Sequence, residues 1–84
     1  MRYYPDSDVA RLNSAAYELE HGSVDRAIQM LRSMDTPEAW NNLGVAYYQQ
    51  NDYQQARQYF NRAAQRGLDT ARRNLDELNK AGMP

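Results

Sequence analysis

Apolar residues recur every three or four positions along most of this 84-residue chain, the spacing that places them on one face of an α-helix. No stretch sustains the alternation of a strand, and three valines, one isoleucine and two threonines are few for a sheet. The pattern therefore predicts an all-α fold. Five helices are expected, over residues 7–21, 24–34, 37–50, 53–66 and 69–80.

Residues that commonly begin or end helices stand at these boundaries. Ser23 precedes the second expected helix, and Thr36 precedes the third, which starts with a proline. Asp52 is followed three residues later by Gln55, the spacing of a capping box. Further start signals are Asp6, Ser7 and Asp69, and the stop signals are Gly22, Asn51, Gly67 and Gly82. Because the connections are short, we expect antiparallel neighbours.

Gly44 lies inside the third expected helix, where glycine costs roughly 1 kcal/mol relative to alanine. Aligning the second and fourth helices superposes Ala27 on Ala56, and the same offset puts Ala15 at the place of Gly44. Both small residues are followed by a helix that folds back close by, and in the last expected helix Asp76 takes this position. We therefore predict that Gly44 permits close packing of the third and fourth helices.

Several residue types at fixed spacings carry a family resemblance: Trp40, Leu43, Gly44, Tyr47, Ala56 and Phe60. With them, residues 37–68 resemble one tetratricopeptide repeat. Residues 8–36 resemble a shortened, degenerate repeat, and residues 69–80 resemble the helix that often closes such arrays. Leu68 departs from the pattern, because the family usually has proline there.

The resemblance implies a single domain over residues 1–84, built as a right-handed stack of antiparallel helix pairs. It also implies a concave groove that binds an extended peptide or partner segment without catalysis. Asparagine suits such a groove, because its side chain offers both a donor and an acceptor to peptide backbone; the alternative is that these asparagines are simply solvated. The matching groove positions are Leu12, Asn13, Ala16, Asn41, Asn42, Val45, Tyr48, Gln49, Arg73, Asn74 and Glu77.

The charge and the composition of the chain exclude several kinds of binding partner. The net charge of −1 gives no strong field to recruit nucleic acid, and no apolar run is long enough to insert into a membrane. The chain has no cysteine, and His21 with its neighbouring glutamates makes no metal site, so neither metal nor cofactor is expected. Five arginines of the second half could clamp a carboxylate or phosphate, or form a solvated face with stems covering apolar neighbours: Arg57, Arg62, Arg66, Arg72 and Arg73.

No nucleophile–base arrangement, paired carboxylates or phosphate loop is present in the sequence, so we do not expect an enzyme. Two hypotheses remain: a peptide-binding interaction module, and a structural spacer or assembly domain without a peptide ligand of its own. Exposure of the groove discriminates between them, because a spacer should have its groove filled.

Six of the seven tyrosines divide into two groups. Tyr47, Tyr53 and Tyr59 fall on core stripes, whereas Tyr3, Tyr4 and Tyr48 are free to contact a partner.

The opening RYYPDSD is typical of the close of a preceding helix, so we expect the chain to end a longer protein. The first helix carries more apolar residues than one neighbour needs, which predicts burial against another molecule, as a homodimer or a crystal contact. The stretch YPDSDVARLNSAAYEL also resembles C-terminal helical-repeat regions of bacterial cell-envelope proteins, which favours the periplasmic side over the cytoplasm.

Overall fold

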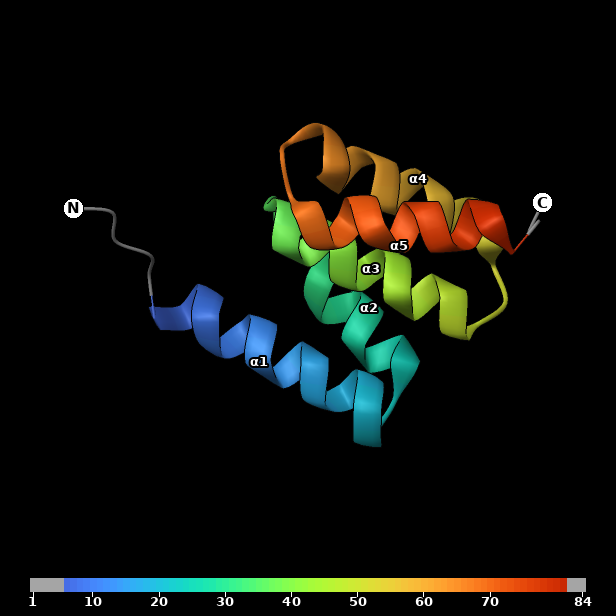
Figure 1. Cartoon of the computed structure of the whole chain (residues 1–84). Helices are drawn as coiled ribbons and strands as arrows, with labels where there is room; N and C mark the ends of the chain where they lie inside the picture. Colours follow the sequence, from blue (N-terminus) through green and yellow to red (C-terminus); the bar gives the residue numbers. More distant parts are fainter. Residues whose placement is uncertain (1–5, 82–84) are drawn as a thin grey trace.

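A computed structural model describes the backbone of residues 6–81 and the side chains of residues 9–81 (Figure 1). All regular structure in this part of the chain is α-helical, and consecutive helices pack against each other, as predicted. The helices are α1 (Asp6–His21), α2 (Val24–Arg32), α3 (Pro37–Gln49), α4 (Tyr53–Gln65) and α5 (Asp69–Lys80).

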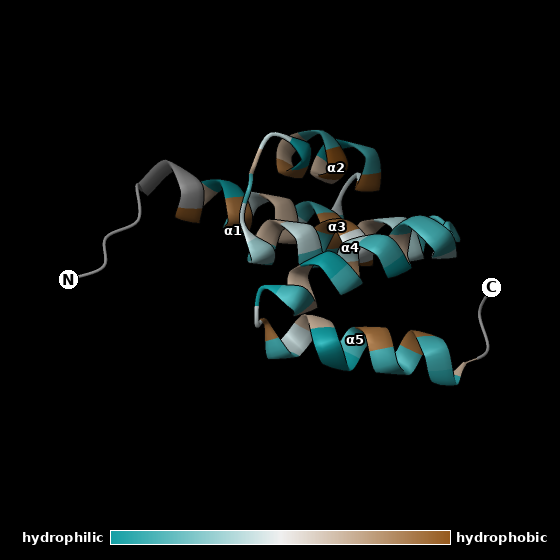
Figure 2. Ribbon diagram, turned by 90° about the horizontal axis from the view of Figure 1, so that it is seen from above, coloured by the Kyte–Doolittle hydropathy of each residue, from teal (hydrophilic) through white to brown (hydrophobic). Residues whose placement is uncertain are grey.

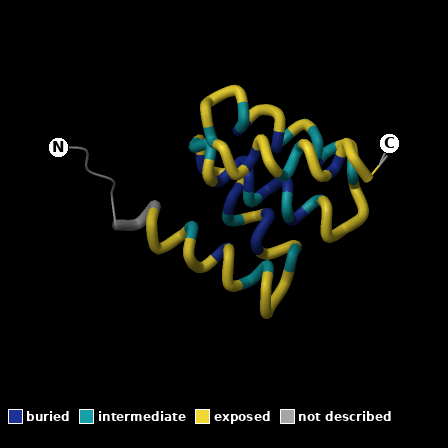
Figure 3. Tube along the Cα trace, viewed as in Figure 1, coloured by how far each residue is buried: buried dark blue, intermediate teal, exposed yellow. Residues whose placement is uncertain are grey.

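The centre of the molecule is α3, which packs against α1, α2 and α4. Figure 2 shows α2 and α5 on opposite sides of α3 and α4, with hydrophobic residues turned inwards. Buried positions gather in the middle of the molecule (Figure 3). One core cluster joins α2 and α3 to single alanines of α1, α4 and α5, and a second joins Ala56 and Phe60 to Leu78.

The close approach of α3 and α4 occurs at Gly44, as predicted. A Cβ added at Gly44 would lie 2.5 Å from Cδ1 and 3.0 Å from Cζ of Phe60, and closer still to Cε1. Phe60 is itself buried, with 4% of its surface exposed. A side chain at position 44 would therefore collide with a ring that has little room to move.

Three of the predicted caps are present. The hydroxyl oxygens of Ser23 and Thr36 each accept a hydrogen bond at 3.2 Å from the backbone N–H three residues later, and Asp52 Oδ1 accepts one from Gln55 N at 3.3 Å. α5 begins at Asp69, as predicted, with Leu68 in the cap position and Asp69 as the acidic residue of the first turn. The side chains of Asp6 and Ser7, and all of Gly82, lie outside the described residues.

The chain leaves α3 and α4 through residues in the left-handed backbone region, Asn51 (φ 65°) and Gly67 (φ 94°). The amide of Leu68 then donates to Ala63 O at 3.3 Å, a bond that closes the helix end. A Cβ at Gly67 would meet no atom within 4 Å. Glycine is therefore favoured at this position by its positive φ angle and not by a lack of space. Both predicted stops are confirmed.

The prediction that the second helix extends to residue 34 is wrong. α2 ends at Arg32, where Ser33 N–H bonds back to Leu31 O. Met34 then turns into the core and is 7% exposed, which requires the chain to leave the helical path.

Candidate functional site

Two hollows lie along the face formed by α1, α3 and α5, which we call the groove face. The first, the α3–α5 hollow, has a volume of about 320 Å³. Its floor is apolar, since it contains Phe60 and Leu78 of the second core cluster. Polar groups of Tyr48, Asn74 and Glu77 line it as well. Its full lining is Val45, Tyr48, Phe60, Asn74, Glu77, Leu78 and Ala81.

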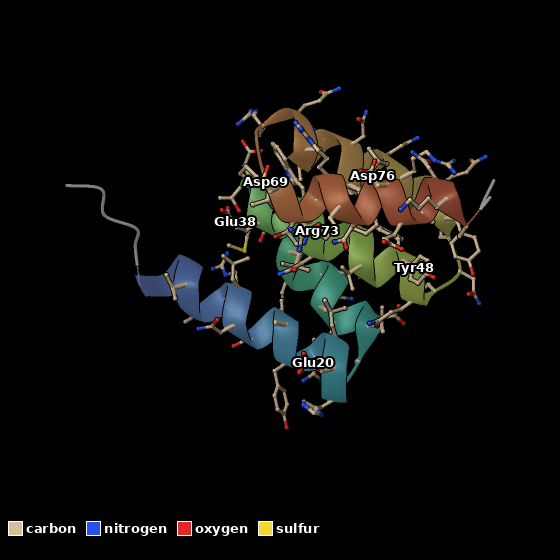
Figure 4. All side chains as sticks on the ribbon, viewed as in Figure 1. Glu20, Glu38, Tyr48, Asp69, Arg73 and Asp76 are labelled. Carbon is tan, nitrogen blue, oxygen red and sulfur yellow. The ribbon has the colours of Figure 1, made fainter. Side chains whose placement is uncertain are left out.

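The second, the α1–α3 hollow, has a volume of about 260 Å³ and also reaches the start of α5. Its lining mixes amide side chains with small apolar ones, because Asn13 and Ala16 of α1 face Asn42 of α3. Figure 4 places Glu38, which lines this hollow, and Tyr48, which lines the other, at opposite ends of α3. The full lining is Leu12, Asn13, Ala16, Glu38, Asn41, Asn42, Leu68 and Thr70.

A hydrogen bond joins the two hollows. Asn74 Nδ2 of α5 donates to Asn41 Oδ1 of α3 at 2.9 Å. Asn74 lines the α3–α5 hollow and Asn41 lines the α1–α3 hollow, so the bond crosses the groove face between them. Asn41 is only 8% exposed, and the interpretation that it is simply solvated is therefore wrong. Its side chain fixes α5 against α3.

The structure brings seven of the nine predicted partner-binding residues into the two hollows: Asn13, Asn41, Asn42, Val45, Tyr48, Asn74 and Glu77. Leu12 and Ala16, also expected there, line the α1–α3 hollow. Gln49 is exposed and lines neither. Arg73 borders a different depression on α5, together with Asp69, Arg72 and Asp76 (Figure 4).

The aromatic rings mostly pack, as predicted. Tyr47 and Tyr59 stack with ring centroids 5.7 Å apart, which joins α3 to α4. Tyr53 meets the ring of Tyr48 edge-on at 5.4 Å. Tyr48 is nevertheless 43% exposed, so one part of its ring is held by Tyr53 while the rest remains available to a partner. Tyr3 and Tyr4 lie outside the described residues.

Two arginines have a position that the sequence reasoning missed. The guanidinium carbons of Arg62 and Arg66 lie 4.8 and 5.1 Å from the centroid of the Trp40 ring. The expected covering of apolar neighbours by aliphatic stems thus understates what these side chains do, because their charged ends stack on an aromatic ring. The signal available in the sequence was the four-residue spacing, which puts both on one helix face.

The described side chains include no group of three or more histidines or acidic residues that could hold a metal ion. Among the helices described, none combines the length and the apolar character needed to cross a bilayer.

In a comparison with known families, residues 37–66, which form α3, α4 and the turn between them, match the tetratricopeptide repeat. This match confirms the resemblance of the segment to a tetratricopeptide repeat. Repeats of this family are generally protein–protein interaction modules and are typically not catalytic. Neither the curated proteins nor the solved structures gave a match.

Proposed function

We propose that this chain binds an extended segment of a partner protein along the groove face. One observation carries the proposal: the two hollows are both lined by residues of α3, and the Asn41–Asn74 hydrogen bond joins a residue of one hollow to a residue of the other. Hollows of this size suit single side chains of a bound segment. The partner's backbone would cross the Asn41–Asn74 bond between them.

The two hollows offer different chemistry to that segment. In the α3–α5 hollow, the apolar floor of Phe60 and Leu78 takes an apolar side chain, and burying it excludes water from both surfaces. In the α1–α3 hollow, Asn13 and Asn42 can each donate to and accept from the partner's backbone. The apolar hollow supplies most of the affinity, and the amides fix the direction of the segment.

The domain organisation that accompanies this function is that α1 and α2 form a degenerate repeat ahead of the matched one, and that α5 closes the array. In support, Ala15 and Ala27 are both completely buried, as is Ala56. Ala15 aligns with Gly44, and Ala27 aligns with Ala56. At both positions, close contact between helices needs a small residue.

The test is a selection of random peptides displayed on phage against the parent, followed by calorimetric titration of selected peptides. A groove variant, Tyr48→Ala with Glu77→Ala, should bind them at least about tenfold more weakly, a loss of about 1.4 kcal/mol. The matched control is Tyr17→Ala with Glu20→Ala, which removes the same residue types from α1 outside both hollows. Equal binding by the parent and the groove variant would contradict the proposal.

The second candidate function, a spacer or assembly domain, is favoured by the outer face of α1. Val9 is 47% exposed and Tyr17 is 63% exposed. An assembly domain would use these residues against another molecule and would leave the groove face empty. The control variant above then becomes informative, because loss of partner binding in that variant alone would favour assembly through α1.

A further inference from the structure

A positively charged surface lies on α4, away from both hollows of the groove face. Between Asp52 and Asp69 the chain contains three arginines and no acidic residue, although its net charge is −1. One of the three, Arg57, donates a hydrogen bond from Nε to Asn79 Oδ1 of α5 at 3.3 Å. The other two, Arg62 and Arg66, lie one helical turn apart at the end of α4 that leads into α5 (Figure 1).

Both guanidinium groups stand over the same ring. Their carbons lie 4.8 Å (Arg62) and 5.1 Å (Arg66) from the centroid of Trp40. Trp40 is 5% exposed and belongs to the main core cluster, so it is a fixed platform. Within the described part of the chain, no carboxylate lies within 4.0 Å of either arginine. Both cations thus stand over one ring without a carboxylate of the described residues as partner.

This arrangement has a defined chemical preference. Stacking on the ring covers one face of a guanidinium and leaves its N–H edge free to donate. A carboxylate accepts two such N–H groups in parallel, and the pair is stronger than a neutral hydrogen bond. An anion between Arg62 and Arg66 also relieves the repulsion between them. The platform holds both side chains in advance, which lowers the conformational entropy lost on binding.

We propose that Arg62 and Arg66, stacked on Trp40, bind aspartate or glutamate side chains of an acidic segment in a partner protein. The site is separate from the groove face and does not depend on the function proposed for it. The residues that line a hollow with Arg62 are neutral: Gln55, Gln58, Tyr59, Asn61 and Gln65. Two guanidinium groups among neutral amides match one or two carboxylates, whereas nucleic acid binding depends on many phosphate contacts.

Trp40 is the only tryptophan in the chain, so tryptophan fluorescence reports on the surroundings of this site alone. The probe is hexaglutamate, titrated into the parent while Trp40 fluorescence is recorded, with hexaglutamine as the neutral counterpart. We expect a saturable change with hexaglutamate and none with hexaglutamine. Isothermal calorimetry on the same pairs gives an affinity that is independent of the ring's surroundings, which matters because replacing the arginines alters the fluorescence directly.

Three variants locate the binding. Arg62→Gln with Arg66→Gln should weaken hexaglutamate binding by about tenfold or more, since both charge-assisted contacts are removed. Arg72→Gln with Arg73→Gln changes the net charge equally on α5 and should bind as the parent does. Arg62→Lys with Arg66→Lys keeps the charge but loses the planar fork, and should recover less than half of the lost binding energy. Circular dichroism confirms that each variant is folded.

Several results would overturn the proposal. These are the absence of a saturable response, an equal loss in the Arg72/Arg73 variant, and full binding by the lysine variant. A further arm uses inorganic phosphate and a ten-nucleotide oligouridylate. If either bound more tightly than hexaglutamate and did so through Arg62 and Arg66, the site would be a phosphate or RNA site and the acidic-partner assignment would be wrong.

Discussion

The absence of a side chain at Gly44 allows α3 and α4 to pack closely. Helix propensity alone favours alanine there by roughly 1 kcal/mol. The ring of Phe60 occupies the space that any Cβ would need. The glycine is therefore retained for the packing of the helix pair, at the expense of the isolated helix.

We predict that Gly44→Ala lowers the free energy of unfolding by about 1 kcal/mol, because overpacking costs about 1–3 kcal/mol and outweighs the propensity gain. Gly44→Leu should cost more. Urea denaturation measures both. In a Phe60→Leu background the penalty of Gly44→Ala should shrink, since the obstructing ring is gone. A Gly44→Ala protein as stable as the parent would refute the close-packing explanation.

The Asn41–Asn74 hydrogen bond is a second feature at the scale of single residues. Asn74→Ala should destabilise the fold by about 1 kcal/mol, because the carbonyl of the buried Asn41 loses its donor. Asn42→Ala is the control, since Asn42 is half-exposed and no side-chain hydrogen bond is described for it. A double-mutant cycle over positions 41 and 74 should give a positive coupling energy, and additive effects would show that the two side chains act independently.

At the scale of helices, the caps decide where α2, α3 and α4 begin. Thr36→Ala should cost about 1 kcal/mol, because the Ala39 N–H loses its acceptor at the start of α3. Thermal unfolding gives the comparison. Thr70→Ala removes the same atoms inside α5, where alanine is the better helix former, and should not destabilise. Equal melting temperatures for Thr36→Ala and the parent would mean that this cap contributes nothing.

The helices and the Gly44 contact could be predicted because their signals are local: stripes, capping residues and a small residue at a fixed offset. The end of α2 could not, because Met34 leaves the helix to reach the core. The start of α5 at Asp69 could be predicted, whereas the position of Leu68, which takes the cap place and packs on the core cluster, could not.

In the candidate site, too, some features could be predicted from the sequence and others could not. Its hollows follow from the helix order, so most of the predicted residues line them. The partnership of Asn41 with Asn74 joins residues 33 positions apart, and the stacking of two arginines on Trp40 joins two helices. Such contacts depend on how the helices pack in three dimensions, which periodicity along the chain does not encode.

At the scale of the whole molecule, the small core leaves α1 incompletely covered. Chains of this length bury a modest share of their surface, so an exposed apolar helix face has much to gain from association. The exposed Val9 and Tyr17 lie on α1. We therefore keep the prediction of a homodimer formed through the N-terminal helix.

Sedimentation velocity at rising concentration checks the prediction. The parent should shift towards twice the monomer mass, and Val9→Ser with Tyr17→Ser should stay monomeric, because the apolar area that a dimer would bury is removed. A parent that is monomeric throughout would count against assembly through α1.

The central claim, that the groove face binds a partner segment, is tested most directly by nuclear magnetic resonance. A ¹⁵N-labelled parent is titrated with a selected peptide, and the amide shifts of every helix are followed at once. We expect the largest changes in the side-chain amides of Asn13, Asn42 and Asn74 and in the backbone of Val45, Tyr48 and Glu77. Changes confined to α4 or to the outer face of α1 at Tyr17 and Glu20, with the groove face silent, would contradict it.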